Sequence, residues 1–115
     1  MSEKFQNYIG GRWVGAKSGR VLMNSSPAAG AALGEFPDSD AADVAEAAAA
    51  ARAAFRSWRL TPAPKRAEIL YRLGQLIATR KEDLARGATR EMGKILIETR
   101  GDVQEGIDMA YLAAG

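Results

Sequence analysis

A glycine–lysine pair, Gly93-Lys94 in the stretch TREMGKIL, could do chemistry because such pairs occur in phosphate-binding loops. In a P-loop, another glycine lies five positions before this glycine, and serine or threonine follows the lysine. Those positions hold Ala88 and Ile95 here, and a helical pattern rather than a strand precedes the pair. We therefore predict that Gly93 ends a helix in the left-handed backbone region, with Lys94 beside the exposed carbonyl groups.

A row of carboxylates follows at spacings of three and four residues, formed by Glu98, Asp102, Glu105 and Asp108. Such a row could supply paired carboxylates for acid–base catalysis, but a solvent-exposed helix face is the commoner arrangement. We interpret the row as an exposed face that pairs with the arginines of the same region. These are Arg66, Arg72, Arg80, Arg86, Arg90 and Arg100.

The chain of 115 residues contains neither cysteine nor histidine. It therefore has no thiol nucleophile, no disulfide, and none of the imidazoles that most often act as general base or metal ligand. The glycines of GGRWVG precede no predicted helix and lack the spacing of a dinucleotide-binding fingerprint. We expect no catalytic and no cofactor-binding residue within this chain.

The composition, with 47% hydrophobic and 26% charged residues, is typical of a soluble globular protein of one modest domain. The net charge is only +2 and acids alternate with bases, which argues against nucleic-acid binding. The most apolar run is interrupted by Asp43, Glu46 and Arg52, so we expect no membrane span. The N-terminus lacks the apolar core of a secretory signal, which favours a cytoplasmic location.

Residues 1–37 are expected to form short strands and turns. The segment NYIGGRWV has apolar and aromatic residues on both sides of Gly10-Gly11, which predicts a tight hairpin because glycine adopts positive φ at low cost. Further strands are predicted at 20–24 and 31–36. Together these elements form a meander that is too thin to bury much by itself.

Residues 38–115 follow a helical period. The first helix has N-cap candidates at Ser39 and Asp40, and we expect a neighbouring element to cover its stripe of Val44, Ala48, Ala51, Phe55 and Trp58. Thr61 is the cap candidate of the next helix. The predicted inner face of that helix consists of Ile69, Leu70, Leu73, Leu76 and Ile77.

A separate short helix is predicted at 81–92, and the last helix carries a stripe of Val103, Ile107, Ala110 and Ala114. Its pattern is still running at Gly115, so we expect a truncated chain. Trp13 and Trp58 are expected to anchor the core. The fold class is therefore α+β: a short hairpin and meander followed by about four helices, without a self-sufficient active site.

The ordered set of motifs resembles the N-terminal segment of the NAD(P)-dependent aldehyde dehydrogenase superfamily. The resemblance is carried by YIGGRWV, SSPAAGAALGEF, DAADVAEAAAAARAAFRSW, KRAEILYRLGQLIATRKEDLA and TREMGKIL, in the order and at the spacing of the family. PAPKRAEI, EMGKIL and GDVQEGID are most similar to the branch of α-aminoadipic semialdehyde dehydrogenase, the antiquitin-like enzymes. The resemblance implies that 1–115 is the N-terminal segment of an aldehyde dehydrogenase α/β fold, with the catalytic domain absent.

The resemblance also implies an activity for the full-length parent, which would oxidise an aldehyde to a carboxylate with NAD or NADP. The catalytic cysteine, the base and the cofactor loop would lie downstream, so the 115-residue chain alone would be inactive. The parent would bind a small-molecule aldehyde and form a homo-oligomer, a dimer or tetramer. The alternative is a free-standing helical binding or regulatory module without enzymatic activity. We favour the segment because its helical faces need a larger surface to cover them.

Two sets of site residues follow from the resemblance. Glu105, in DVQE, matches a glutamate that contacts the polar end of the substrate in the antiquitin-like branch. Several family structures hold a structural monovalent cation. The matching ligands here would be the carboxylate of Glu91 and backbone carbonyls near Asn24 and Ser25.

Overall fold

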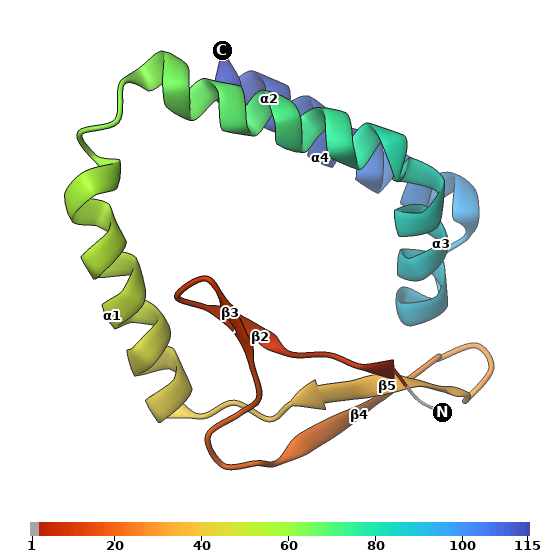
Figure 1. Cartoon of the computed structure of the whole chain (residues 1–115). Helices are drawn as coiled ribbons and strands as arrows, with labels where there is room; N and C mark the ends of the chain where they lie inside the picture. Colours follow the sequence, from red (N-terminus) through yellow and green to blue (C-terminus); the bar gives the residue numbers. More distant parts are fainter. Residues whose placement is uncertain (1–2) are drawn as a thin grey trace. The chain divides into compact units, whose positions relative to one another are not determined.

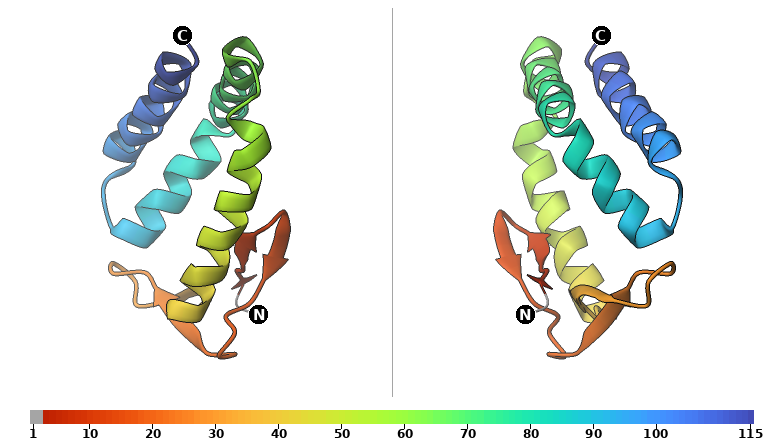
Figure 2. Two further views of the ribbon diagram at one scale, coloured as in Figure 1. Left: turned by 90° about the vertical axis from the view of Figure 1, so that its left-hand side faces the viewer. Right: turned by 90° about the vertical axis from the view of Figure 1, so that its right-hand side faces the viewer.

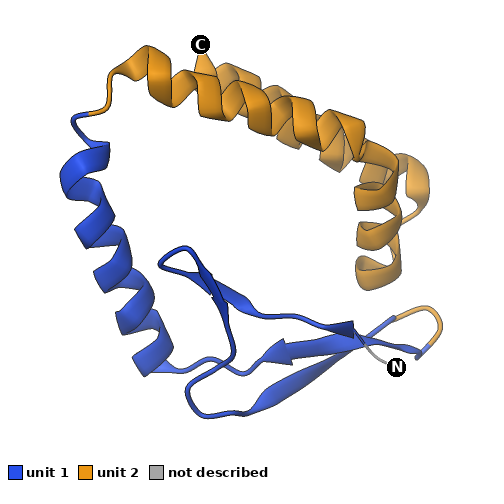
Figure 3. Cartoon of the chain, in the orientation of Figure 1, with its two compact units in different colours: residues 1–26, 30–60 blue, residues 27–29, 61–115 orange. Residues whose placement is uncertain are grey.

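The computed structural model describes residues 3–115, which form two compact units (Figures 1 and 3). Unit 1 comprises the described residues up to 26 together with 30–60, and unit 2 comprises 27–29 and 61–115. Unit 1 holds five short strands and one helix, whereas unit 2 holds three helices. The predicted fold class, short strands followed by four helices, is confirmed.

The strands of unit 1 are β1 (Glu3–Lys4), β2 (Asn7–Ile9), β3 (Arg12–Val14), β4 (Val21–Ser25) and β5 (Ala32–Pro37). Strands β2 and β3 form an antiparallel hairpin in which Tyr8 lies opposite Trp13. Gly10 and Gly11 occupy its turn with φ of 59° and 79°, a pair of left-handed positions that matches the right-handed twist of the strands. The predicted hairpin is confirmed.

The other strands pair differently from a meander. They form a separate sheet of order β1-β5-β4, in which β1 runs parallel to β5. Phe5 secures this pairing, because its N–H donates to the Glu35 carbonyl at 2.9 Å and its ring stacks on Phe36 at 4.3 Å between centroids. A parallel pair between segments so far apart in the chain is not signalled by local alternation, so the sequence pattern alone missed β1.

Helix α1 (Ala41–Trp58) begins at Asp40, one of the predicted caps. The Asp40 carboxylate accepts from the Ala42 N–H at 2.8 Å, and the Asp43 carboxylate accepts from the Asp40 N–H at 3.0 Å. Asp43 also accepts from the Lys17 N–H at 2.9 Å, so one buried carboxylate ties the loop before β4 to the start of the helix. These backbone donors, that of Asp40 first, hold the pKa of Asp43 below its ordinary value of 3.8.

A lowered pKa makes Asp43 a source of acid-sensitive stability. The ionised carboxylate stabilises unit 1 at pH values above 3.8, and this contribution is lost as the pH falls through the lower pKa of the folded state. We expect the thermal midpoint of unit 1, followed by the fluorescence of Trp13 and Trp58, to drop between about pH 5 and pH 2. Asp43→Asn should lower the midpoint at neutral pH and flatten this dependence.

The control is Glu3→Gln, which removes an exposed carboxylate of β1 and should leave both the midpoint and its acid dependence unchanged. An Asp43→Asn profile parallel to that of the unmodified chain would contradict the assignment.

The predicted burial of the α1 stripe is wrong within this chain. Val44 and Phe55 are exposed, and Asp43 is the buried residue of the helix. The tryptophans do not anchor a core either, since Trp13 is 66% and Trp58 43% exposed. Periodicity identifies an apolar face, but a second surface is needed to cover it, and unit 1 offers only the small β2–β3 hairpin.

Unit 2 consists of α2 (Ala63–Thr79), α3 (Lys81–Met92) and α4 (Leu96–Ala114). Helices α2 and α4 lie side by side, and α3 packs against α4 (Figure 2). The predicted stripe of α4 is confirmed at its centre, where Ile107 and Ala110 are buried. Ala85 of α3 and Thr99 of α4 are fully buried as well, so small side chains dominate this core.

The contact face of α2 differs from the prediction. Leu70 and Ile77 of the predicted face are partly buried, but Ile69, Leu73 and Leu76 remain about half exposed. The buried residue of the helix is Gly74, which lies against the ring of Tyr111. Thr61 is not the cap, because the helix begins after Pro62 without a side-chain hydrogen bond. Glycine thus allows α2 and α4 to approach at a place where larger apolar residues were expected to pack.

Helix α3 ends as predicted at Gly93, which has φ of 76° and donates its N–H to the Thr89 carbonyl at 2.9 Å. The predicted partner of Lys94, the exposed carbonyl groups at the end of α3, is wrong. Its ammonium group lies 2.6 Å from the Asp102 carboxylate of α4 rather than at the carbonyl end of α3. Within residues 3–115, none of the helices is both long and apolar enough to cross a membrane.

Candidate functional site

Charged side chains connect α3 to α4. The Glu82 carboxylate accepts two hydrogen bonds from Arg100, at 2.9 and 2.8 Å, and also lies 2.9 Å from Arg86 one turn further along α3. The Arg100 hydrogen bond is the main cause of the lowered pKa of Glu82, and Glu82 in turn raises the pKa of Arg100. The expected pairing of arginines with the acidic row is therefore wrong for Arg86 and Arg100.

The acidic row of α4 has other partners. Asp102 binds Lys94 and is the largest cause of the raised pKa of that lysine, to which Glu98 and Glu105 add through charge. Asp108 accepts a hydrogen bond from the Gln104 amide at 2.9 Å. The row is solvent-exposed, as expected, but it is joined to its surroundings by lysine and glutamine.

Gln104 lies in a short polar chain that begins in α3. The Lys81 ammonium donates to the Gln104 side-chain oxygen at 2.7 Å, which fixes the amide so that its nitrogen faces Asp108. Glu105, the predicted substrate residue, is exposed beside this chain, and its side chain makes no hydrogen bond or ion pair in the described part of unit 2. Its carboxylate is therefore available to an external group.

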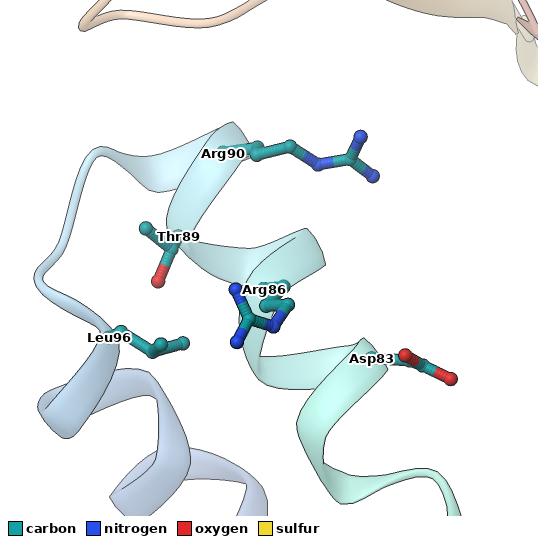
Figure 4. A pocket seen from close by; sticks show the side chains of 5 residues that line it. All are labelled: Asp83, Arg86, Thr89, Arg90 and Leu96. Carbon is teal, nitrogen blue, oxygen red and sulfur yellow. The ribbon is translucent and has the colours of Figure 1, made fainter.

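A cavity of about 450 Å³ opens beside α3 and the first residue of α4 (Figure 4). It is lined by Asp83, Arg86, Thr89, Arg90 and Leu96. The Thr89 hydroxyl lies 2.8 Å from that of Thr99, and Thr99 also donates to the Leu96 carbonyl at 3.1 Å. The hydroxyl pair fixes the wall of the cavity where α3 meets α4.

The residues predicted for a monovalent cation lie in different units. Asn24 and Ser25 end strand β4 in unit 1, where they pair with Gly34 and Ala32 of β5. The register shift between the two pairs leaves Leu33 of β5 as the extra residue. Glu91 is exposed in the last turn of α3 in unit 2. Between residues 3 and 115 no three carboxylates cluster closely enough to hold a metal ion by themselves.

Comparison with known proteins assigns the chain to a family. The model of the family described as "Aldehyde dehydrogenase family" matches residues 13–115. The chain belongs to the aldehyde dehydrogenase family. It corresponds to the N-terminal segment of these enzymes, and it is 43% identical over 113 residues to malonate-semialdehyde dehydrogenase 2 of Geobacillus kaustophilus. That alignment covers 98% of this chain but only 23% of the relative.

Solved aldehyde dehydrogenases contain the same fold. An NAD-dependent aldehyde dehydrogenase from Sinorhizobium meliloti matches with a TM-score of 0.94 and 33% identity, covering 100% of this chain and 24% of its own. A succinate-semialdehyde dehydrogenase from Burkholderia pseudomallei matches with a TM-score of 0.87 and 40% identity, covering 90% and 21%. The chain thus spans about a quarter of the length of its relatives.

Several residues of this aldehyde dehydrogenase segment were not found from the sequence. The pair of Glu82 and Arg86 could have been predicted, because a carboxylate four residues before an arginine is a helical pairing signal. The contact of Glu82 with Arg100, and that of Lys81 with Gln104, depends on how two helices cross and carries no local signal. Thr99 gave none either, since a threonine within a helix is usually assigned to its polar face.

Proposed function

We propose that the protein containing this segment is an NAD(P)-dependent enzyme that oxidises an aldehyde to a carboxylate. The match of residues 13–115 to the aldehyde dehydrogenase family is the observation that carries the proposal. In such a reaction a cysteine thiolate adds to the aldehyde carbon, and hydride then leaves the thiohemiacetal for the nicotinamide. Water activated by a glutamate hydrolyses the resulting thioester and releases the carboxylate and the thiol. The cysteine and the cofactor site belong to residues downstream of this segment.

The proposed substrate class is a semialdehyde, an aldehyde whose other end is a carboxylate. The similarity to enzymes named for malonate and succinate semialdehyde supports this class. The antiquitin-like branch is a finer proposal, supported by DVQE and by the exposure of Glu105. A glutamate suits the ammonium group of α-aminoadipic semialdehyde, whereas it would repel the carboxylate of malonate semialdehyde.

The experiment begins with the coding sequence after Gly115. We expect it to continue in frame into a cysteine-bearing catalytic motif, and the expressed longer protein to reduce NAD or NADP when given a semialdehyde. The chain of 115 residues, assayed alone as the control, should give no NADH or NADPH absorbance at 340 nm. Turnover by this chain, or unrelated sequence downstream, would contradict the proposal.

Glu105→Gln in the longer protein separates the two substrate proposals. With an amino-bearing semialdehyde, KM should rise while kcat changes little, because the lost contact binds the far end of the substrate. With malonate semialdehyde, KM should stay the same or fall. Glu98→Gln, on the same row of α4, is the control and should leave both constants unchanged.

Three further properties are proposed, the first two from the family and the third from the N-terminal sequence. They are a monovalent cation site involving Asn24, Ser25 and Glu91, assembly into a dimer or tetramer, and a cytoplasmic location.

A further inference from the structure

The cavity beside α3 has the size of a small-ligand site and lies wholly within unit 2. Its volume of about 450 Å³ falls in the range that small molecules occupy in proteins. Two of its five lining side chains, Arg86 and Arg90, end in guanidinium groups and extend from successive turns of α3 (Figure 4). Like charges at this spacing repel each other. The two side chains extend in different directions (Figure 4), so Arg90 would have to turn toward Arg86 for one anion to contact both.

The charges around the cavity do not balance. Arg86 lies against Glu82, but the same carboxylate also binds both nitrogens of Arg100, so two guanidinium groups share one acid. Arg90 makes no ion pair or hydrogen bond with any side chain of the described chain. Within the lining itself, two guanidinium groups accompany one carboxylate, that of Asp83, so the lining carries an excess of one positive charge.

The walls of the cavity are held in place. Arg86 is oriented by Glu82 at 2.9 Å, and Thr89 is joined to the fully buried Thr99 at 2.8 Å. Leu96 supplies an apolar side, beside which a short carbon chain could lie. An entering ligand would therefore have to order the side chain of Arg90 but not the framework around it.

We propose that this cavity binds a small oxyanion, a carboxylate or a phosphate, through Arg90 and the free edge of Arg86. Guanidinium groups suit this chemistry because their parallel N–H donors match two oxygens of a planar or tetrahedral anion. The carboxylate of Asp83 also lines the cavity and disfavours ligands with several negative charges, so the ligand is a small one. The proposal does not depend on the dehydrogenase activity that is proposed for the longer protein.

The test is a titration of the 115-residue chain with sodium phosphate or sodium acetate at constant ionic strength. The arginine Nε–Hε signals and the Leu96 methyl signals are followed by NMR. We expect saturable shifts of Arg86, Arg90 and Leu96, with a Kd on the order of 1 mM or tighter for at least one anion. Comparison of the two titrations identifies whether phosphate or carboxylate is preferred, and sodium chloride serves as the blank.

Arg90→Gln should weaken the binding about tenfold, because it removes both the positive charge and the paired N–H donors of the guanidinium group. Arg90→Lys keeps the charge and should give an intermediate affinity. The matched control is Arg72→Gln, which removes an exposed arginine of α2 outside the cavity and should bind like the unmodified chain. Shifts that are linear in anion concentration, equal at Arg72 and Arg90, or unchanged in Arg90→Gln would overturn the proposal. So would a chain whose spectrum lacks the dispersion of folded helices.

Discussion

Replacing Ile107 with alanine should lower the free energy of unfolding of unit 2 by about 2–4 kcal/mol, the largest effect expected from any single truncation in this chain. Ile107 is 4% exposed at the centre of α4, whereas most other large apolar side chains of the unit remain open to solvent. The other buried apolar residues of unit 2, Ala85 and Ala110, are small and cannot expand to fill the space it would leave. A unit of this size has a stability of only several kcal/mol, so the loss approaches the total.

The measurement is urea unfolding of the chain, followed by far-UV circular dichroism and by amide hydrogen exchange in α4. Tryptophan fluorescence reports on unit 1 separately, because Trp13 and Trp58 both lie there. Ile97→Ala is the matched control: the same truncation in the same helix, at a side chain that is 71% exposed. It should change stability by no more than about 0.5 kcal/mol. Equal effects of the two substitutions would show that Ile107 is not the centre of the core.

Gly74→Ala should destabilise the α2–α4 contact by about 1–3 kcal/mol, although alanine is the better helix former. A Cβ at this position would lie 2.6 Å from Cε1 of Tyr111 and 3.0 Å from two further ring atoms. The ring is held near Tyr71, at 6.0 Å between centroids, so it must shift together with its neighbour or the helices must separate. Either response loses packing along the contact that organises unit 2.

Gly101→Ala provides a control of opposite sign. Nothing lies within 4 Å of a Cβ at Gly101 in α4, so the substitution should stabilise the helix by up to about 1 kcal/mol. Urea unfolding of both variants, and of Gly74→Ala combined with Tyr111→Leu, completes the comparison. In the Tyr111→Leu background the penalty at Gly74 should largely disappear. If Gly74→Ala alone stabilises as much as Gly101→Ala, the tyrosine ring moves aside freely and the contact is not steric.

The parts of the fold that sequence reasoning found are those decided by a few neighbouring residues. The Gly10-Gly11 turn, the Asp40 cap and the Gly93 stop each follow from backbone geometry that only certain side chains satisfy. Strand β1 was missed because its partner β5 lies about thirty residues further along. Such a pairing depends on loop closure and on the stacking of Phe5 with Phe36, neither of which leaves a periodic signal.

Burial was harder to predict than secondary structure. The predicted stripe through Ile107 is buried because α4 has two neighbouring helices. Val44 and Phe55 lie on an equally regular stripe of α1 but stay exposed. At the site, the exposed acidic face of α4 was predicted correctly but its partners were not. Which cation reaches Asp102 or Glu82 depends on the crossing of α3 and α4, a property of two helices together.

The exposed apolar side chains of both units would affect how the protein behaves during its synthesis. In the longer protein proposed above, this segment would leave the ribosome before the residues that follow it, and its relatives are about four times as long as the part that it matches. At roughly 5–20 residues per second, synthesis of the residues that follow would last on the order of tens of seconds. Val44, Phe55, Leu60 and Leu112 would stay uncovered throughout this interval. The nascent chain would therefore offer holding chaperones a defined set of apolar contacts, and the rate of translation, rather than the stability of the finished enzyme, would determine how long they persist.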